Sequence, residues 1–150
     1  MKRSKYEKLY RGDVIYANLG QHPNSSVQSG NRPCIVVSND KSNQCSEVYN
    51  VLPCTRRIKK NPIHVRVMPS DVRGYFERES DILAEQIMTI GENQITSKVG
   101  VIPSDSEISH LINRAIIQQL NLEEEIRLIA LELIKEGMLC AEENKSEAIC

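Results

Sequence analysis

The sequence predicts a mainly β fold, a small barrel or curled antiparallel sheet, followed by a helical C-terminal region. Between residues 14 and 102, short β-branched apolar segments alternate with turns that contain glycine or proline. No strand–helix–strand rhythm interrupts them, which argues against a parallel sheet. After Pro103 the apolar residues recur every three or four positions, which is the period of a helix.

We expect the 150 residues to form a single domain with a sizeable core. Its consecutive parts are an N-terminal arm at 1–10, the barrel at 11–103, a helical region at 104–137 and a flexible tail at 138–150. No apolar run approaches the ~20 residues that span a bilayer, and the N-terminus lacks the apolar core of a secretory signal. We therefore expect a cytoplasmic protein with no membrane partner.

The first expected strand, Val14–Leu19, is rich in β-branched and aromatic residues. A polar loop of twelve residues, 20–31, follows it, and loops of this length are usually functional or disordered. The second strand, Cys34–Val37, is apolar on both faces and therefore predicted to be buried. Pro33 fixes φ and lacks an N–H, so we expect it to open this strand.

Arg32 is the single charged residue at the junction between this loop and the second strand. A side chain held between a mobile loop and a rigid strand is well placed for catalysis or phosphate binding. The structural alternatives are a surface ion pair or a stem lying along apolar surface, and this position alone leaves the choice open.

The remaining strands are expected at short intervals. A turn-rich connection at Asp40–Ser46 precedes a third strand, Glu47–Thr55, in which Pro53 indicates an edge or a bulge. The later segments are a strand at Ile63–Val67, a turn at Asp71–Phe76, one or two strands with a bulge within Ser80–Ile90, and a last strand at Lys98–Ile102.

Two apolar stripes predict helices after the barrel. The first consists of Ile108, Leu111, Ile112, Ala115, Ile116 and Leu120, and the second of Leu122, Ile126, Ile129, Ala130, Leu133 and Ile134. Ser104 and Glu107 have capping-box spacing, and Gly137 is a natural C-cap. The helical region is one extended amphipathic helix or a helix pair, and its second stripe either packs on the barrel or forms a subunit contact.

The residue inventory excludes several kinds of catalytic site. The five cysteines contain no C-x-x-C pair, and the three histidines lack metal-ligand spacing. The sequence contains no P-loop, G-x-G-x-x-G or G-x-S-x-G motif. We therefore expect neither a metal nor another cofactor.

A basic surface with a hydroxyl group, beside the long loop, remains as the candidate site. Its residues lie at strand ends or in loops: Arg32, Thr55, Arg56, Arg57, Lys59 and Lys60. Guanidinium and ammonium groups suit phosphate oxygens, and residues 1–100 carry a net charge of +5 against −6 for residues 101–150.

RNA can be cleaved without a metal when its 2′-hydroxyl attacks the adjacent phosphate. An arginine and a hydroxyl can then stabilise the extra negative charge.

Four short segments of the chain form a specific combination. They are Arg11–Leu19, Gly30–Val37, Leu52–Thr55 and Ser80–Ile90, and they include the patterns G-x-R-P, P-x-T and E-Q-I-x-T-I. In order and approximate spacing they resemble the successive motifs of the MazF/PemK toxin family, over about Arg11 to Leu120.

This resemblance implies a small SH3-like barrel with a C-terminal helix, acting as a homodimer. It also implies a sequence-specific, metal-independent endoribonuclease that cuts single-stranded mRNA to 2′,3′-cyclic phosphate and 5′-hydroxyl ends, with a cognate antitoxin as its inhibitor. Arg32 then matches the main catalytic residue and Thr55 its hydroxyl partner. The residues expected to contact RNA are Gln28, Asn31, Arg56, Arg57, Lys59, Ser80, Glu85 and Gln86.

The chain departs from the family pattern in two places. Val27 replaces a loop residue that is acidic in some members, which leaves the general acid and base unassigned. The helix beyond Leu122 is longer than the family needs, and its acidic residues could line a dimer seam or imitate an antitoxin's acidic tail. The alternative functions are a non-enzymatic, gyrase-poison-like toxin and an RNA-binding module of the same fold.

Overall fold

The computed structural model describes residues 7–148, and side chains as far as residue 138. The mainly β prediction is confirmed. The strands are β1 (Asp13–Asn18), β2 (Asn31–Val36), β3 (Val48–Thr55), β4 (His64–Val67), β5 (Arg73–Gly74), β6 (Ser80–Leu83), β7 (Met88–Gly91) and β8 (Ile95–Val101). The helices are α1 (Asp40–Cys45), α2 (Glu107–Gln119) and α3 (Glu123–Ala148).

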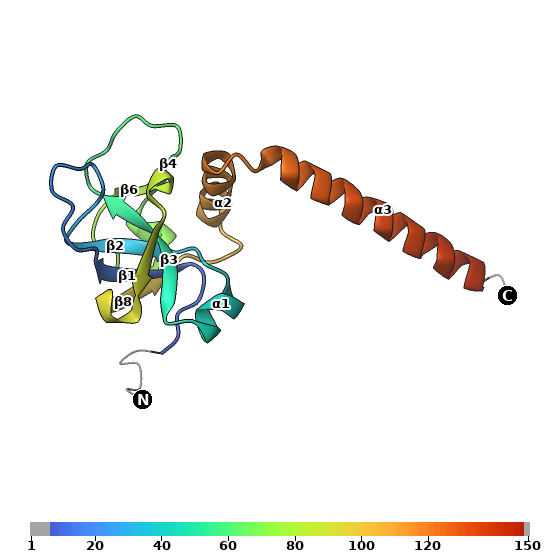
Figure 1. The fold of residues 1–150 in the computed structure, drawn as a ribbon, viewed down its shortest axis with the longest axis horizontal. Helices are drawn as coiled ribbons and strands as arrows, with labels where there is room; N and C mark the ends of the chain where they lie inside the picture. The colour runs from blue at the N-terminus through green and yellow to red at the C-terminus, as the bar shows by residue number, and fades with distance from the viewer. Residues whose placement is uncertain (1–6, 149–150) are drawn as a thin grey trace. The chain divides into compact units, whose positions relative to one another are not determined.

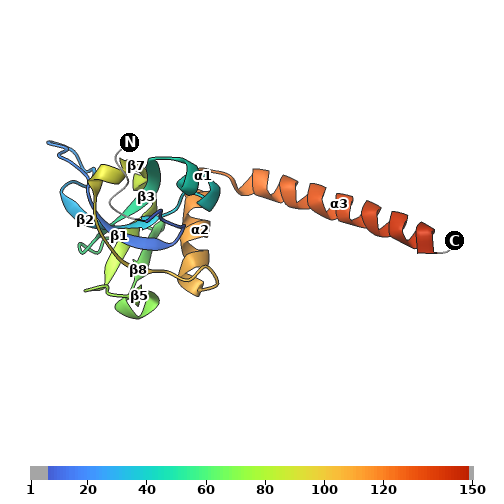
Figure 2. The ribbon, with the colours of Figure 1, turned by 90° about the horizontal axis from the view of Figure 1, so that it is seen from below.

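The strands form one curled antiparallel sheet in the order β4-β6-β3-β2-β1-β8-β5, with β7 paired to β3 (Figures 1 and 2). β3 changes partner along one edge: residues 48–51 pair with β7, whereas Cys54 and Thr55 pair with Ile82 and Asp81 of β6. The sheet therefore brings the loop before β2 close to the end of β3 and to β6.

The central strands are apolar on both faces because the sheet is covered on both sides. Val14, Ile35 and Leu52 belong to a core that includes Ile108 and Ile112 of α2. The neighbouring residues of the same strands point into a second core, with members Ile15, Cys34, Val36 and Val51. The alternation follows from the twofold period of a strand. α2 lies against the sheet in both views (Figures 1 and 2).

Pro33 and Pro53 both lie within strands, at positions where the neighbouring strand needs no N–H from them. Pro33 lies inside β2 opposite Tyr16, so the expectation that it opens the strand is wrong. The β2–β3 ladder begins only at Cys34, which leaves Pro33 outside that ladder. Pro53 lies at the position where β3 passes from β7 to β6. The irregularity expected there is thus a change of partner strand.

Two other local expectations are corrected, and a third, one or two strands within Ser80–Ile90, is confirmed in part. Residues 40–45 form a short helix instead of a turn, because the Asn39 side chain caps it by accepting the amide of Ser42. Residues 80–91 form two strands separated by a 3₁₀ turn, η2 (Ala84–Gln86). At α2 the cap is Ser106 and not Ser104, since the Ser106 hydroxyl accepts the amide of Ser109.

The helical region is a helix pair. α2 ends at Gln119. Asn121 follows it with a left-handed φ of 55°, and the amide of Leu122 bonds the carbonyl of Ile117 in a Schellman turn. α3 then runs through Gly137 to Ala148, so the expected C-cap is wrong and part of the expected tail is helical. A glycine within a helix costs about 1 kcal/mol and does not end it.

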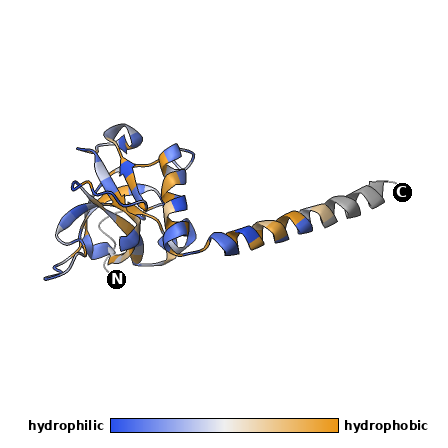
Figure 3. Ribbon diagram, turned by 90° about the horizontal axis from the view of Figure 1, so that it is seen from above, coloured by the Kyte–Doolittle hydropathy of each residue, from blue (hydrophilic) through white to orange (hydrophobic). Residues whose placement is uncertain are grey.

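The chain divides into two compact units, Met1–Ile116 and Ile117–Cys150. In the second unit, large apolar side chains of α3 are exposed, among them Ile126, Ile129, Leu133 and Ile134. Figure 3 shows hydrophobic and hydrophilic residues interspersed along this helix. Among the described residues, no helix is long and apolar enough to cross a membrane.

Candidate nucleic-acid interface

A groove of about 790 Å³ opens where the β1–β2 loop, the end of β3 and η2 meet. It contains seven of the residues predicted from the sequence, Gln28, Arg32, Thr55, Arg57, Lys59, Glu85 and Gln86. A neighbouring hollow, which shares Ser29, Arg32, Thr55 and Arg57 with the groove, contains the other three, Asn31, Arg56 and Ser80. The fold thus gathers all ten predicted residues around Arg32 and Thr55.

Within the described part of the chain, Arg32 hydrogen-bonds through only one nitrogen of its guanidinium. Its Nε donates to the carbonyl of Ser29 at 2.8 Å, three residues earlier in the chain. This bond orients the planar group from the loop side and leaves the two terminal nitrogens for an anion in the groove. The half-buried position at the start of β2 limits the freedom of the side chain.

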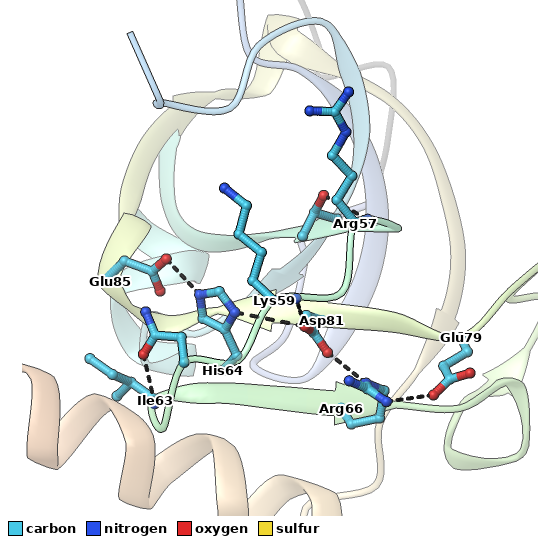
Figure 4. A network of polar contacts seen from close by, with 10 residues as sticks. Arg57, Lys59, Ile63, His64, Arg66, Glu79, Asp81 and Glu85 are labelled. Atoms are coloured by element: carbon cyan, nitrogen blue, oxygen red, sulfur yellow. Dashed lines mark hydrogen bonds and ion pairs between the residues drawn. The ribbon is translucent and has the colours of Figure 1, made fainter.

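Thr55 ends β3 and is buried, directly opposite Asp81 of β6. Its Oγ1 accepts the amide of Arg57 at 3.2 Å, so the hydroxyl proton stays available to a ligand. The amide of Lys59 donates to Asp81 Oδ2 at 3.2 Å. This bond anchors the basic loop, residues 56–60, that follows β3. In Figure 4 the side chains of Arg57 and Lys59 extend toward the same side of the sheet.

The individual cations of this loop differ in how freely they can meet a ligand. Arg57 and Lys59 line the groove, and so does Lys60. Arg56 instead forms an ion pair with Glu77 and lies at the neighbouring hollow. The groove is therefore positively charged on this side even with Arg56 partly compensated.

A network of ionisable side chains begins at the groove with His64 and Glu85 and continues to Asp81, Arg66 and Glu79 (Figure 4). His64 of β4 donates from Nε2 to Glu85 Oε1 at 2.7 Å, and its Nδ1 lies 3.7 Å from Asp81 Oδ2. The second distance allows electrostatic attraction but is too long for a hydrogen bond. Asp81 Oδ1 in turn accepts from Arg66 Nε at 2.6 Å, and Arg66 also bonds Glu79.

Two ionisable side chains of this network are unusually well buried. The His64 side chain is only 5% exposed, and that of Asp81 only 2%. His64 Nδ1 and Glu85 Oε2 are buried without a hydrogen-bond partner among the described residues. Buried polar atoms are normally paired, so these two unpaired atoms distinguish the His64–Glu85 pair from the other polar groups of the groove wall.

His64 is a groove residue that no sequence motif marked, since the three histidines lack metal-ligand spacing. The signal that could have found it is Asp81, a charge within the apolar segment 80–84. A buried charge in a strand requires a partner on the neighbouring strand. In the structure those partners are Arg66 and His64 of β4.

Comparison with known proteins agrees with this geometry. Residues 10–120 match the family model described as a PemK-like, MazF-like toxin of a type II toxin–antitoxin system. The chain is 35% identical over 116 residues to the endoribonuclease MazF of Staphylococcus saprophyticus, an alignment that covers 76% of this chain and 92% of the relative. It is 41% identical over 92 residues to the endoribonuclease EndoA of Bacillus subtilis, covering 59% of this chain and 76% of the relative.

Solved structures show the same fold. The crystal structure of MazF from Deinococcus radiodurans superimposes with a TM-score of 0.64 at 18% identity, covering 77% of this chain and 99% of that one. A mycobacterial endoribonuclease in complex with its cognate antitoxin superimposes with a TM-score of 0.61 at 24% identity, covering 76% and 96%. On the family match and the curated relatives together, the chain belongs to the PemK-like, MazF-like toxins of type II toxin–antitoxin systems.

Proposed function

We propose that this protein is an endoribonuclease toxin that cuts single-stranded mRNA in the groove around Arg32 and Thr55. The observation that carries the proposal is that the groove brings a loop-oriented arginine, a buried threonine hydroxyl and a carboxylate, Glu85, to one basic surface. The names of its curated relatives, endoribonucleases EndoA and MazF, support the same reaction class.

The proposed reaction is attack of a ribose 2′-hydroxyl on the adjacent phosphorus. The bond from phosphorus to the 5′-oxygen breaks, and the leaving oxygen takes a proton from solvent water. The products are a 2′,3′-cyclic phosphate and a 5′-hydroxyl. The terminal nitrogens of Arg32 and the hydroxyl of Thr55 donate to the phosphoryl oxygens, where negative charge increases in the transition state. Removal of one such preorganised donor typically costs about 10²–10³ in rate.

Glu85 is the proposed acceptor of the 2′-hydroxyl proton. Its Oε1 is fixed by His64, and the Glu85 side chain is 28% exposed at the groove wall. This assignment answers the question raised by Val27, because the acidic group comes from η2 instead of the loop. His64 is a positioning residue here, since its Nε2–H is engaged by Glu85.

We further propose that the active form is a cytoplasmic homodimer inhibited by a cognate antitoxin. A mycobacterial relative of the same fold is described in complex with its antitoxin. An acidic antitoxin segment would meet Arg57, Lys59 and Lys60 in the groove, where it would compete with RNA for the same charges.

The test uses purified protein, EDTA and a long mRNA, followed by an oligonucleotide with a single 2′-deoxy substitution at the mapped cut. We expect discrete cuts in EDTA, 2′,3′-cyclic phosphate ends, and loss of cleavage with the deoxy substrate and with Arg32→Ala. Arg73→Ala, at an exposed arginine of β5, is the matched control. RNA that is bound but never cut would instead support an RNA-binding module, and unbound RNA with undiminished toxicity of Arg32→Ala would support a protein target.

A further inference from the structure

The β1–β2 loop leaves the sheet through a narrow neck. The amide of Leu19 bonds the carbonyl of Gly30 at 2.9 Å, and the amide of Gly30 bonds the carbonyl of Gly20 at 2.9 Å. Both glycines have positive φ, 78° and 76°, which other residues rarely adopt. Residues 21–29 extend beyond this neck, and most of their side chains are exposed.

One side chain from outside the loop fastens this extended part. Gln86 Oε1 accepts the amide of Gln28 at 2.8 Å, and Gln86 Nε2 donates to the carbonyl of Ser26 at 3.1 Å. Among the described residues, Gln86 is the one side chain outside 20–30 that hydrogen-bonds residues 21–28. The carboxamide therefore holds the loop backbone at two points, using its acceptor and its donor.

The segment held by Gln86 is linked to Arg32 by a hydrogen bond. Ser29 follows Gln28, and the Ser29 carbonyl accepts Arg32 Nε at 2.8 Å. Displacement of the segment 26–29 would move this carbonyl and with it the orientation of the guanidinium. We propose that Gln86 is a positioning residue, whose carboxamide fixes residues 26–29 as the groove wall and thereby orients Arg32.

This inference deepens the proposed ribonuclease function, and its catalytic half rests on that function. It differs from a simple RNA contact by Gln86 because it concerns the protein without RNA. A contact residue contributes when RNA is bound, whereas a positioning residue keeps the loop ordered beforehand. Preorganisation of this kind changes kcat more than the affinity for substrate.

The first measurement is therefore amide hydrogen exchange in the RNA-free protein. We expect exchange at Gln28 to become about tenfold or more faster in Gln86→Ala, because one hydrogen bond and its local closure are lost. Gln94→Ala is the matched control. Gln94 also bonds backbone with both carboxamide atoms, accepting from the amide of Gly91 and donating to the carbonyl of Asn18, but it does not bond residues 21–28. The control should leave exchange at Gln28 unchanged.

The second measurement is single-turnover cleavage, with affinity determined on the 2′-deoxy oligonucleotide. We expect Gln86→Ala to lower the cleavage rate about 10- to 100-fold while affinity changes less than about threefold. Gln86→Glu retains the acceptor for Gln28 but sets a carboxylate against the Ser26 carbonyl. It should therefore also loosen the loop and slow cleavage.

The outcomes separate the two proposals. Unchanged exchange at Gln28 in Gln86→Ala overturns the positioning role, and a selective loss of affinity would then make Gln86 an RNA contact. Faster exchange with an unaltered cleavage rate overturns the link to Arg32. Absence of cleavage by the wild-type protein would contradict the ribonuclease function, while the exchange result would still decide whether Gln86 orders the loop.

Discussion

His64 Nε2 lies 2.7 Å from Glu85 Oε1, and both side chains line the groove that contains Arg32. If Glu85 accepts the 2′-hydroxyl proton, Glu85→Gln should lower the single-turnover cleavage rate about 10²–10⁴-fold, because an amide cannot accept it. His64→Ala should have a smaller effect of about tenfold, because it removes the orientation of Glu85 and not the carboxylate. Both rates are measured across pH with saturating enzyme.

A substrate with sulfur in place of the 5′-oxygen identifies the direction of proton transfer. Its leaving group needs no proton, so a defect in the general acid disappears with this substrate and a defect in the general base persists. We expect the Glu85→Gln defect to persist. Recovery to the wild-type rate would make Glu85 the general acid, and an unaltered rate with weaker binding would make it an RNA contact only.

Arg57 should contribute to RNA affinity through charge. It lines the groove, whereas Arg73 lies exposed on β5 outside it. Each phosphate neutralised on single-stranded RNA adds about 0.7 to the slope of log affinity against log salt concentration. Fluorescence anisotropy with the 2′-deoxy oligonucleotide should show this slope reduced by about 0.7 in Arg57→Ala. Equal slopes for Arg57→Ala and Arg73→Ala would exclude a phosphate contact.

Much of the barrel could be predicted because its strands are short, β-branched and separated by turn residues. The positions of Pro33 and Pro53 were harder to predict, because whether a strand tolerates a proline depends on which neighbouring strand needs its N–H. Pro33 is acceptable within β2 only because the ladder with β3 starts at Cys34. Gly137 likewise suggested a helix end, yet a glycine is a modest cost that a long helix tolerates.

Part of the candidate site could likewise be predicted from the sequence, and part could not. Arg32 and Thr55 could be placed together because both stand at strand ends within specific motifs. The ionisable network at the groove depends on the β4–β6 register, which pairs Arg66 with Asp81 and His64 with Leu83. Sequence alternation gives the face of each side chain but not its cross-strand neighbour. The charge of Asp81 therefore signals that a partner exists on a neighbouring strand, but the pattern does not identify Arg66 and His64 as the partners.

Stability should fall at alkaline pH through Cys34. Burial raises the pKa of this thiol from 9.0 to about 12, and the charge of Arg32 opposes the shift only in part. Above pH 9 the unfolded chain loses the proton while the folded chain keeps it, so stability falls as pH rises. The expected loss is about 1.4 kcal/mol per pH unit for this thiol.

Urea unfolding of Cys34→Ala between pH 9 and about 10.5 checks this expectation. The variant should show a slope against pH that is shallower than wild type by that amount, whatever its stability at neutral pH. Burial also raises the pKa of Cys54, so part of the alkaline loss should remain. Cys45→Ala, at an exposed thiol, is the control. A wild-type slope in Cys34→Ala would contradict the assignment.

The groove should function without α3. The family match ends at residue 120, and the residues of the groove all precede residue 87. The Schellman turn at Asn121 ends α2 locally, so a chain of residues 1–122 ends at a natural boundary. We expect this shortened chain to keep the barrel, a melting temperature within a few degrees of the full chain, and the cleavage pattern.

Removal of the exposed apolar side chains of α3 should also lower non-specific association. Calorimetry, light scattering and primer extension on the same mRNA measure these three quantities. Loss of folding would make α3 part of the stable domain, and loss of cleavage with folding intact would assign it a role in activity.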